Sequence, residues 1–164
     1  MYASLRCDLL ETARKRCDQA VDANPSHALG WLYRGTVNAF KGDGDAAINA
    51  TRRAMELSPL DPQRYYFESL GATAELSAHQ YANAEILARS SLVLNRMHPS
   101  TWRALTISLV SQGRMDEARE ALGKVRELEP ELTVAKYLAR LPNAQLETGR
   151  QWALCLEMAG LPAS

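Results

Sequence analysis

A chain of 164 residues is long enough for one well-buried core or for a short run of stacked repeats. Nineteen Lys and Arg residues balance nineteen Asp and Glu residues. The chain therefore has no net positive charge to attract nucleic acid or an anionic membrane, which argues against either partner. No apolar run reaches membrane-spanning length, and the first residues lack a signal-peptide core. The cysteines, Cys7, Cys17 and Cys155, form no CxxC pair, so reduced thiols and a cytoplasmic location are expected.

Apolar periodicity and turn signals predict an all-helical chain without strands. The first helix is expected over residues 3–23 and ends at an Ala-Asn-Pro sequence. Three helical pairs follow in the prediction: 26–41 with 45–57, 61–77 with 80–95, and 99–112 with 115–129. Two further helices are expected at 131–140 and 144–159, the second closed by Gly160 and Pro162.

Two of the predicted pairs carry related residues at identical spacing. The first set is Trp31, Gly35, Gly42, Ala47, Ala54 and Pro59, and the second is Trp102, Thr106, Gly113, Ala118, Val125 and Pro130. A third copy lies between them with Ala84 in the place of Ala47 and Ala118, and it begins three residues late. A half copy, which ends at Pro25, precedes the first set. The distances Pro25 to Pro59 and Ala84 to Ala118 are both 34 residues.

A 34-residue period with Trp and Gly in one helix, small residues in the next and a closing Pro resembles the tetratricopeptide repeat (TPR) family over residues 10–135. The small side chains allow two antiparallel helices to approach closely, and the large ones fill the space between layers. The resemblance implies a single domain over residues 1–164. Its fold would be a right-handed α-α superhelix of stacked antiparallel pairs, with about three full repeats plus capping helices. It also implies a protein-protein interaction scaffold rather than an enzyme.

Three phrases carry a closer resemblance: Leu57-Ser58-Pro59-Leu60-Asp61-Pro62 with the Tyr pair after it, Ala139-Arg140-Leu141-Pro142, and Ala159-Gly160-Leu161-Pro162. They are similar to the C-terminal TPR region of bacterial proteins in which the repeats follow an adenylate/guanylate cyclase domain or a winged-helix DNA-binding domain. The resemblance implies that the chain is the regulatory, partner-binding part of a larger signalling or transcription protein. Two alternatives stay open: a free-standing TPR adaptor that self-associates through the N-terminal helix, and part of a cyclase whose catalytic domain lies outside this segment.

In a TPR stack the first helix of each pair lines a concave groove, where a peptide or a helix can dock. Helical spacing selects as groove residues Leu29, Tyr33, Thr36, Phe40, Tyr66, Leu70, Arg103 and Ile107. The aromatic residues and Arg103 are expected to contribute most, because these residue types dominate binding hot spots. The alternative interpretation is packed core, which is the more frequent role of aromatics at helical spacing. The identity of the partner does not follow from spacing.

No catalytic residue, metal or cofactor is expected. The glycines around residues 41–45 lack the GKS/T sequence and the preceding strand of a nucleotide-binding loop. The three histidines fall in different interhelical turns, and none pairs with another ligand at metal-binding spacing. The serines lack a nucleophile elbow or a nearby base.

Overall fold

The computed structural model describes the backbone of residues 2–164 and the side chains of residues 8–164, so the Cys7 thiol lies outside the described residues. Within this range the chain is helical and contains no strand. The helices are α1 (Tyr2–Ala23), α2 (Ala28–Lys41), α3 (Gly44–Leu57), α4 (Arg64–Ser77), α5 (Tyr81–Leu94), α6 (Pro99–Ser111), α7 (Met115–Leu128), α8 (Val134–Arg140) and α9 (Glu147–Ala159).

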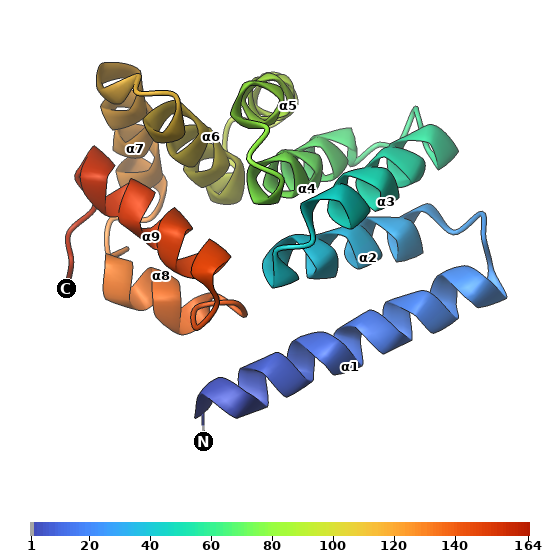
Figure 1. The fold of residues 1–164 in the computed structure, drawn as a ribbon. Coiled ribbons are helices and arrows are strands. Elements are labelled where there is room, and N and C mark those ends of the chain that lie inside the picture. The colour runs from blue at the N-terminus through green and yellow to red at the C-terminus, as the bar shows by residue number, and fades with distance from the viewer. Residues whose placement is uncertain (1) are drawn as a thin grey trace.

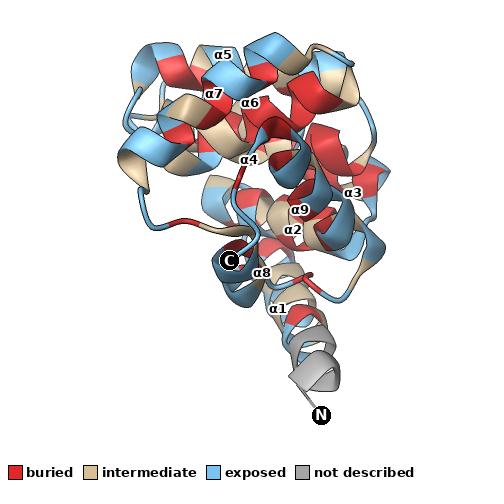
Figure 2. Cartoon of the chain, turned by 90° about the vertical axis from the view of Figure 1, so that its left-hand side faces the viewer, coloured by how far each residue is buried: buried red, intermediate tan, exposed pale blue. Residues whose placement is uncertain are grey.

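Figure 1 shows three helical hairpins, α2–α3, α4–α5 and α6–α7, stacked in chain order. The predicted all-α architecture of stacked pairs is therefore confirmed. The connection between α3 and α4 covers residues 58–63, whereas those before α2 and α6 cover only 24–27 and 95–98. Most of the three extra residues before the middle copy therefore lie in the connection after α3. Buried residues concentrate where helices face each other, as Figure 2 shows in red.

The tryptophan of each well-kept repeat makes the same hydrogen bond. The indole Nε1 of Trp31 donates to the carbonyl of Pro25 at 2.9 Å, and that of Trp102 donates to the carbonyl of Arg96 at 2.8 Å. Both bonds link a residue to the backbone six positions earlier, and so they fix each first helix to the connection before it. The sequence repeat is therefore also a repeat of contacts.

Small residues set the distance between the two helices of a pair. A Cβ atom at Gly35 would lie 2.5 Å from Thr51 Cγ2 and 3.0 Å from the carbonyl oxygen of Ala47, which is closer than side chains pack. The alanines of the second helices are fully buried: Ala47, Ala54, Ala84 and Ala118, with Val125 in the corresponding place of α7. Pro59 and Pro130 follow the ends of α3 and α7, where no further helical hydrogen bond is needed.

The turn inside each pair requires a left-handed backbone. Gly42 and Gly113 have φ values of 82° and 76°, and glycine adopts this region without a steric penalty. In the middle pair the same place is taken by His79 with φ of 58°, and its Nδ1 lies 2.8 Å from the hydroxyl of Tyr81. The turn geometry is thus kept even where the glycine is not.

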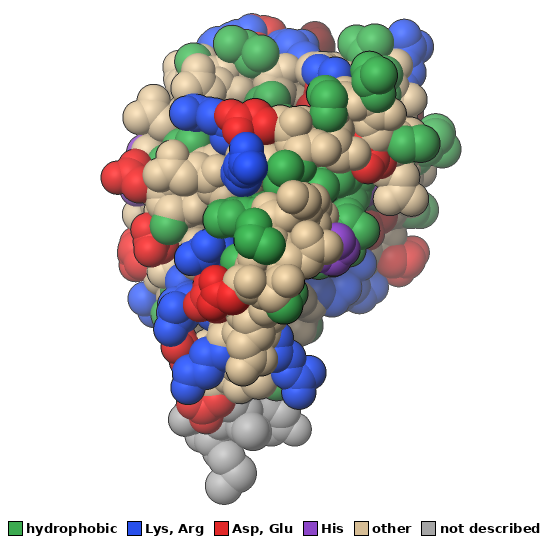
Figure 3. Space-filling model, turned by 90° about the vertical axis from the view of Figure 1, so that its right-hand side faces the viewer, with side chains coloured by type: hydrophobic (Ala, Val, Ile, Leu, Met, Phe, Trp, Pro, Cys, Tyr) green, Lys and Arg blue, Asp and Glu red, His purple; other side chains and the backbone are tan. Residues whose placement is uncertain are grey.

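Helix α1 packs along α2 and covers the N-terminal end of the stack. Arg34 Nε lies 2.9 Å from a carboxylate oxygen of Asp18, and Lys41 Nζ lies 2.7 Å from Glu11. Among residues 8–23, Leu9 is the one large apolar side chain that is mostly exposed. Figure 3 shows charged side chains over the lower part of the molecule, where α1 lies. The outer side of α1 is therefore largely polar, as a capping helix requires.

Candidate protein-binding site

The predicted groove residues lie on α2, α4 and α6, on the side of the stack against which α9 packs. We call this side the inner surface. Two contacts show that this side of the stack faces α9. The ring of Phe40 meets that of Trp152 edge-on, with centroids 6.2 Å apart and planes at 62°. Ile107 is 3% exposed and, with Trp152 and Cys155, lines a cavity of about 230 Å³.

Helix α9 occupies the C-terminal section of the inner surface. Trp152 is 5% exposed and Leu156 is fully buried, and both belong to the main hydrophobic core together with residues of α6 and α7. The start of α9 passes so close to the preceding loop that a Cβ at Gly149 would lie 2.2 Å from the carbonyl oxygen of Asn143. The helix contacts α2, α6, α7 and α8. It therefore bridges the first and third pairs, as Figure 1 shows.

The end of the chain is tied to α8 by backbone hydrogen bonds. Gly160 ends α9 in the left-handed region, with φ of 112°. The amide of Val134 then donates to the carbonyl of Pro162 at 2.8 Å, and that of Ala135 donates to the carbonyl of Ala163 at 3.1 Å. With a buried apolar face and a tied end, α9 is an integral part of the fold. It closes the predicted groove at Ile107.

An open section remains at the N-terminal end of the inner surface. We call it the inner patch and define it as Leu29, Tyr33, Thr36, Tyr66 and Leu70. Leu29 is 37% exposed and Tyr33 is 46% exposed, while the other three are half-buried. Burial and, after it, the neighbouring Tyr33 phenol raise the pKa of Tyr66. The structure thus brings five of the predicted groove residues onto one accessible surface.

His98, which precedes α6, packs against the two tyrosines of α4. Its ring lies edge-on to those of Tyr65 and Tyr66, with centroid distances of 5.4 and 6.1 Å. Its Nδ1 lies 2.7 Å from the hydroxyl of Thr101. Burial, and then the charge of Arg103, lower the pKa of His98. The neutral ring is therefore favoured at this position, in keeping with a packing role for the histidine.

Arg103 is not the exposed, unpaired cation that a peptide-binding site would use. It forms an ion pair with Glu129 and donates to the hydroxyl of Ser100 at 2.8 Å. Its guanidinium lies 5.9 Å from the centre of the Tyr137 ring, and the side chain is 18% exposed. These contacts join α6 to the residue after α7 and to α8. The positive charge is thus largely matched within the chain.

The described side chains show no constellation for catalysis. No group of three His, Cys, Asp or Glu residues among them is arranged to hold a metal ion. Cys17 and Cys155 are free thiols, and burial raises the pKa of each. No helix in the described part of the chain combines the length and apolar character that a membrane span requires.

Sequence reasoning missed the position of α9. Its apolar residues indicate a packed helix, but the same side chains would suit a cap on the end of α7 or a helix laid across the inner surface. The repeat spacing contains no signal that separates these two, because α9 lies outside the repeats. The occupied section of the groove follows only from the three-dimensional packing.

No protein-family model matches this chain, and no curated protein matches it in sequence. Solved structures do. The crystal structure of MamA superposes with a TM-score of 0.63 at 17% identity, covering 92% of this chain and 86% of that one. The first TPR of Spaghetti (RPAP3), bound to the HSP90 peptide SRMEEVD, gives 0.58 at 20% identity, covering 80% and 94%. YrrB, described as a TPR protein with an unusual peptide-binding site, gives 0.58 at 21% identity, covering 96% and 81%.

These identities are low, so the likeness concerns the fold. It agrees with the 34-residue sequence period, the repeated tryptophan hydrogen bonds and the left-handed turn within each pair. Taken together, these observations show that the chain adopts the tetratricopeptide repeat fold.

Proposed function

We propose that this chain is a protein-protein interaction scaffold that binds a peptide or a helix of its partner at the inner patch. The observation that carries the proposal is the exposure of Leu29 and Tyr33 on a surface otherwise closed by α9. Apolar and aromatic side chains of this size are exposed at a cost in solvation free energy, and a partner that covers them recovers it. Two of the proteins with the same fold bind peptides, according to their descriptions.

The chemistry of the inner patch favours an apolar or aromatic anchor in the ligand. Tyr33 and Tyr66 are the aromatic residues of the patch, and Leu29 and Leu70 extend its apolar area along α2 and α4. Arg103, the one cation among the predicted groove residues, is paired with Glu129 and so is little available to a carboxylate. Binding at this patch is therefore expected to depend weakly on salt.

Binding by two alanine variants tests the proposal. A library of random peptides is selected on the full chain, and the affinity of each binder is measured by fluorescence anisotropy. The Tyr33→Ala and Tyr66→Ala variants should each weaken binding by about tenfold, which is the loss of one aromatic contact. Leu60→Ala is the matched control, because Leu60 is 91% exposed and lies in the connection after α3. Binders that tolerate both tyrosine variants would move the site elsewhere.

The wider setting is also part of the proposal. We infer a cytoplasmic chain without catalytic activity of its own, which forms the regulatory C-terminal part of a bacterial signalling or transcription protein. The Leu-Pro phrases support this, and in the structure Leu141 and Leu161 are buried beside α8 and α9. A reading frame in which a cyclase or winged-helix domain precedes this segment would support the inference. A frame that starts at Met1 would refute it.

Self-association through α1 is the alternative. The polar outer side of α1, with Leu9 as its exposed large apolar residue among residues 8–23, disfavours a stable homodimer there. Sedimentation velocity across a range of concentrations decides between the two. A dimer that Leu9→Glu disperses would establish the alternative, and a monomer throughout would dismiss it.

A further inference from the structure

A second apolar surface lies on the opposite side of the stack from α9. Ile86 and Val93 of α5 and Met97 of the connection after it are 65%, 79% and 70% exposed. The seven-residue interval places Ile86 and Val93 on one face of α5, and Met97 follows them in the connection after the helix. Figure 1 shows α5 near the top of the molecule and α9 below it, near the middle, and Figure 3 shows hydrophobic side chains over the upper part of the molecule.

Comparison of the repeats shows that exposed apolar residues at the places of Ile86 and Val93 are specific to α5. The positions of α7 and its following turn that correspond to Ile86, Val93 and Met97, 34 residues later, hold glutamates at 120, 127 and 131. The position that corresponds to Val93 in α3, 37 residues earlier, is again a glutamate, Glu56. A glutamate is therefore compatible with the fold at this place. The packing of the stack does not require an apolar residue there.

Beside these residues runs a groove between α5 and α7, with a volume of about 620 Å³. We call it the outer groove. Its floor comes from Leu92, Trp102 and Leu105, and its apolar walls from Val93, Met97 and Leu128. Leu92 and Leu105 are 6% and 2% exposed, so the floor is the edge of the main core.

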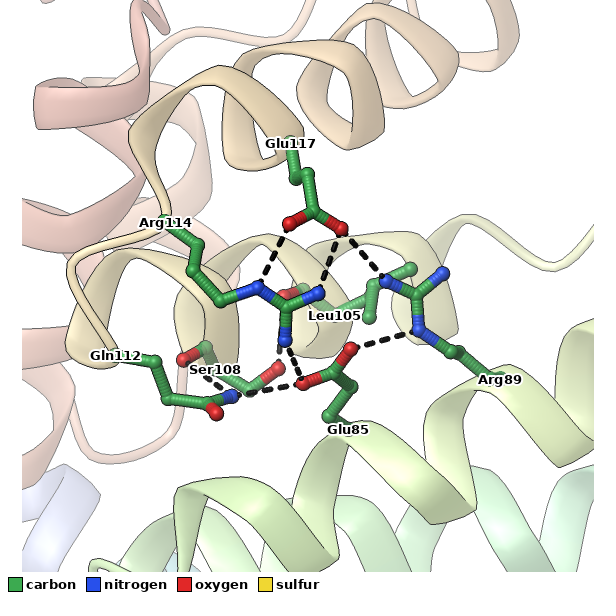
Figure 4. A network of polar contacts seen from close by, with 7 residues as sticks. All are labelled: Glu85, Arg89, Leu105, Ser108, Gln112, Arg114 and Glu117. Carbon is green, nitrogen blue, oxygen red and sulfur yellow. Dashed lines mark hydrogen bonds and ion pairs between the residues drawn. The ribbon is translucent and has the colours of Figure 1, made fainter.

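One end of the outer groove is closed by a network of ion pairs, shown in Figure 4. Arg89 reaches Glu85 at 2.8 Å and Glu117 at 3.2 Å. Arg114 bridges the same two carboxylates at 2.5 and 2.6 Å. These bonds hold the start of α7 against α5, so the groove has a fixed width at this end. It is therefore formed before any partner binds.

The open end of the outer groove is positively charged. Arg96 lies there and makes no ion pair within the part of the chain that the structure describes, and Lys124 faces it from α7. Lys124 pairs with Glu127 at 2.8 Å, the single acidic residue that lines the groove. The charge of Arg96 is thus left unmatched beside an apolar surface. A partner that places an acidic residue at this end would match it.

Backbone chemistry indicates the conformation of the partner segment. The backbone groups of α5 and α7 are already hydrogen-bonded within their helices, so the groove offers no exposed edge to a strand. A segment that lies on this apolar floor must satisfy its own backbone, as a helix does. From Arg89 to Val93 on α5, and from Lys124 to Leu128 on α7, the groove follows about 6 Å of helix axis, or roughly one turn.

We propose that the outer groove binds a short amphipathic helix of another protein, with apolar side chains at three- and four-residue spacing and acidic residues over Arg96 and Lys124. This site is independent of the inner patch, on the other side of the stack. A chain with both sites would hold two partner segments at once and so act as a bridge between them.

Peptide selection with a counter-selection tests the proposal. A library of peptides of about four helical turns is selected on the full chain and depleted on the Val93→Glu/Met97→Glu double variant, which introduces the residue type of α7. The enriched peptides should have the apolar spacing and a net negative charge. Their dissociation constants should rise at least about tenfold with the double variant and with Arg96→Glu, and stay within about twofold with Tyr33→Ala.

Each other result overturns the proposal. Absence of enrichment, or enrichment of basic peptides, would refute the stated partner chemistry. Binders that Tyr33→Ala weakens and the double variant does not would belong to the inner patch and would support only the proposed function. A wild-type dimer in sedimentation that Val93→Glu disperses would assign the outer groove to a second copy of the chain. Circular dichroism melting of the double variant verifies its folding.

Discussion

Truncation of Trp152 to alanine tests whether α9 is an integral part of the fold. The side chain is 5% exposed, contacts Phe40 of the first pair edge-on and belongs to the main core with residues of α6 and α7. Removal of a buried tryptophan costs about 3–5 kcal/mol, because both the transfer free energy and the packing of the cavity walls are lost. For a chain of this size that corresponds to a melting temperature lower by roughly 10 °C.

The assay is urea unfolding followed by circular dichroism, with Leu154→Ala as the matched control. Leu154 lies on the same helix and is 54% exposed, so its truncation should cost less than about 1 kcal/mol. A loss below about 1 kcal/mol for Trp152→Ala would show that α9 is not packed as described. An increase in peptide affinity of the variant would indicate instead that α9 is a displaceable lid over the groove.

Three further predictions concern backbone and charge. Gly35→Ala should lower the unfolding free energy by about 1 kcal/mol, because the added Cβ clashes with Thr51. Gly123→Ala, in a helix with open space around it, should raise the unfolding free energy by up to about 1 kcal/mol. Equal effects of the two variants in urea unfolding would argue against close packing of α2 on α3. Gly113→Ala should cost about 1 kcal/mol from its φ of 76° alone, because no atom lies near the added Cβ, and an unchanged melting temperature would contradict this. The pKa of His98 is lowered in the fold by burial and a nearby arginine, so its contribution to stability is complete above about pH 6.5 and falls as the pH drops toward the folded-state pKa. The stability advantage of the wild type over His98→Gln should therefore shrink between pH 7.5 and 5.5, and a growing advantage would refute the sign.

The repeats could be predicted from the sequence because their chemistry is local. Trp31 and Trp102 bond to the connection six residues earlier, and Gly35 packs against a helix that follows it directly. Contacts at such short separations recur with the sequence period. The helix boundaries follow from the same turn signals, of which Gly42 is the clearest.

The rest of the site depends on contacts that the period does not contain. Trp152 of α9 contacts Phe40, more than a hundred residues earlier, and no sequence pattern in either segment predicts this contact. Arg103 has the spacing of a groove residue, yet Glu129 from the end of the next helix takes up its charge. The outer groove had a signal in the sequence, since Val93 stands where two other repeats have glutamate. That signal becomes meaningful only when the outer side of α5 is known to be exposed.

The most direct test of the scaffold account is chemical-shift mapping of backbone amides with a peptide selected on the full chain. The account predicts perturbations on the inner side of α2 and α4, centred on Tyr33 and Tyr66, or along the outer groove at Val93, and in each case their loss in the matching variant. Perturbations confined to α1, or spread over the whole chain without a centre, would contradict it.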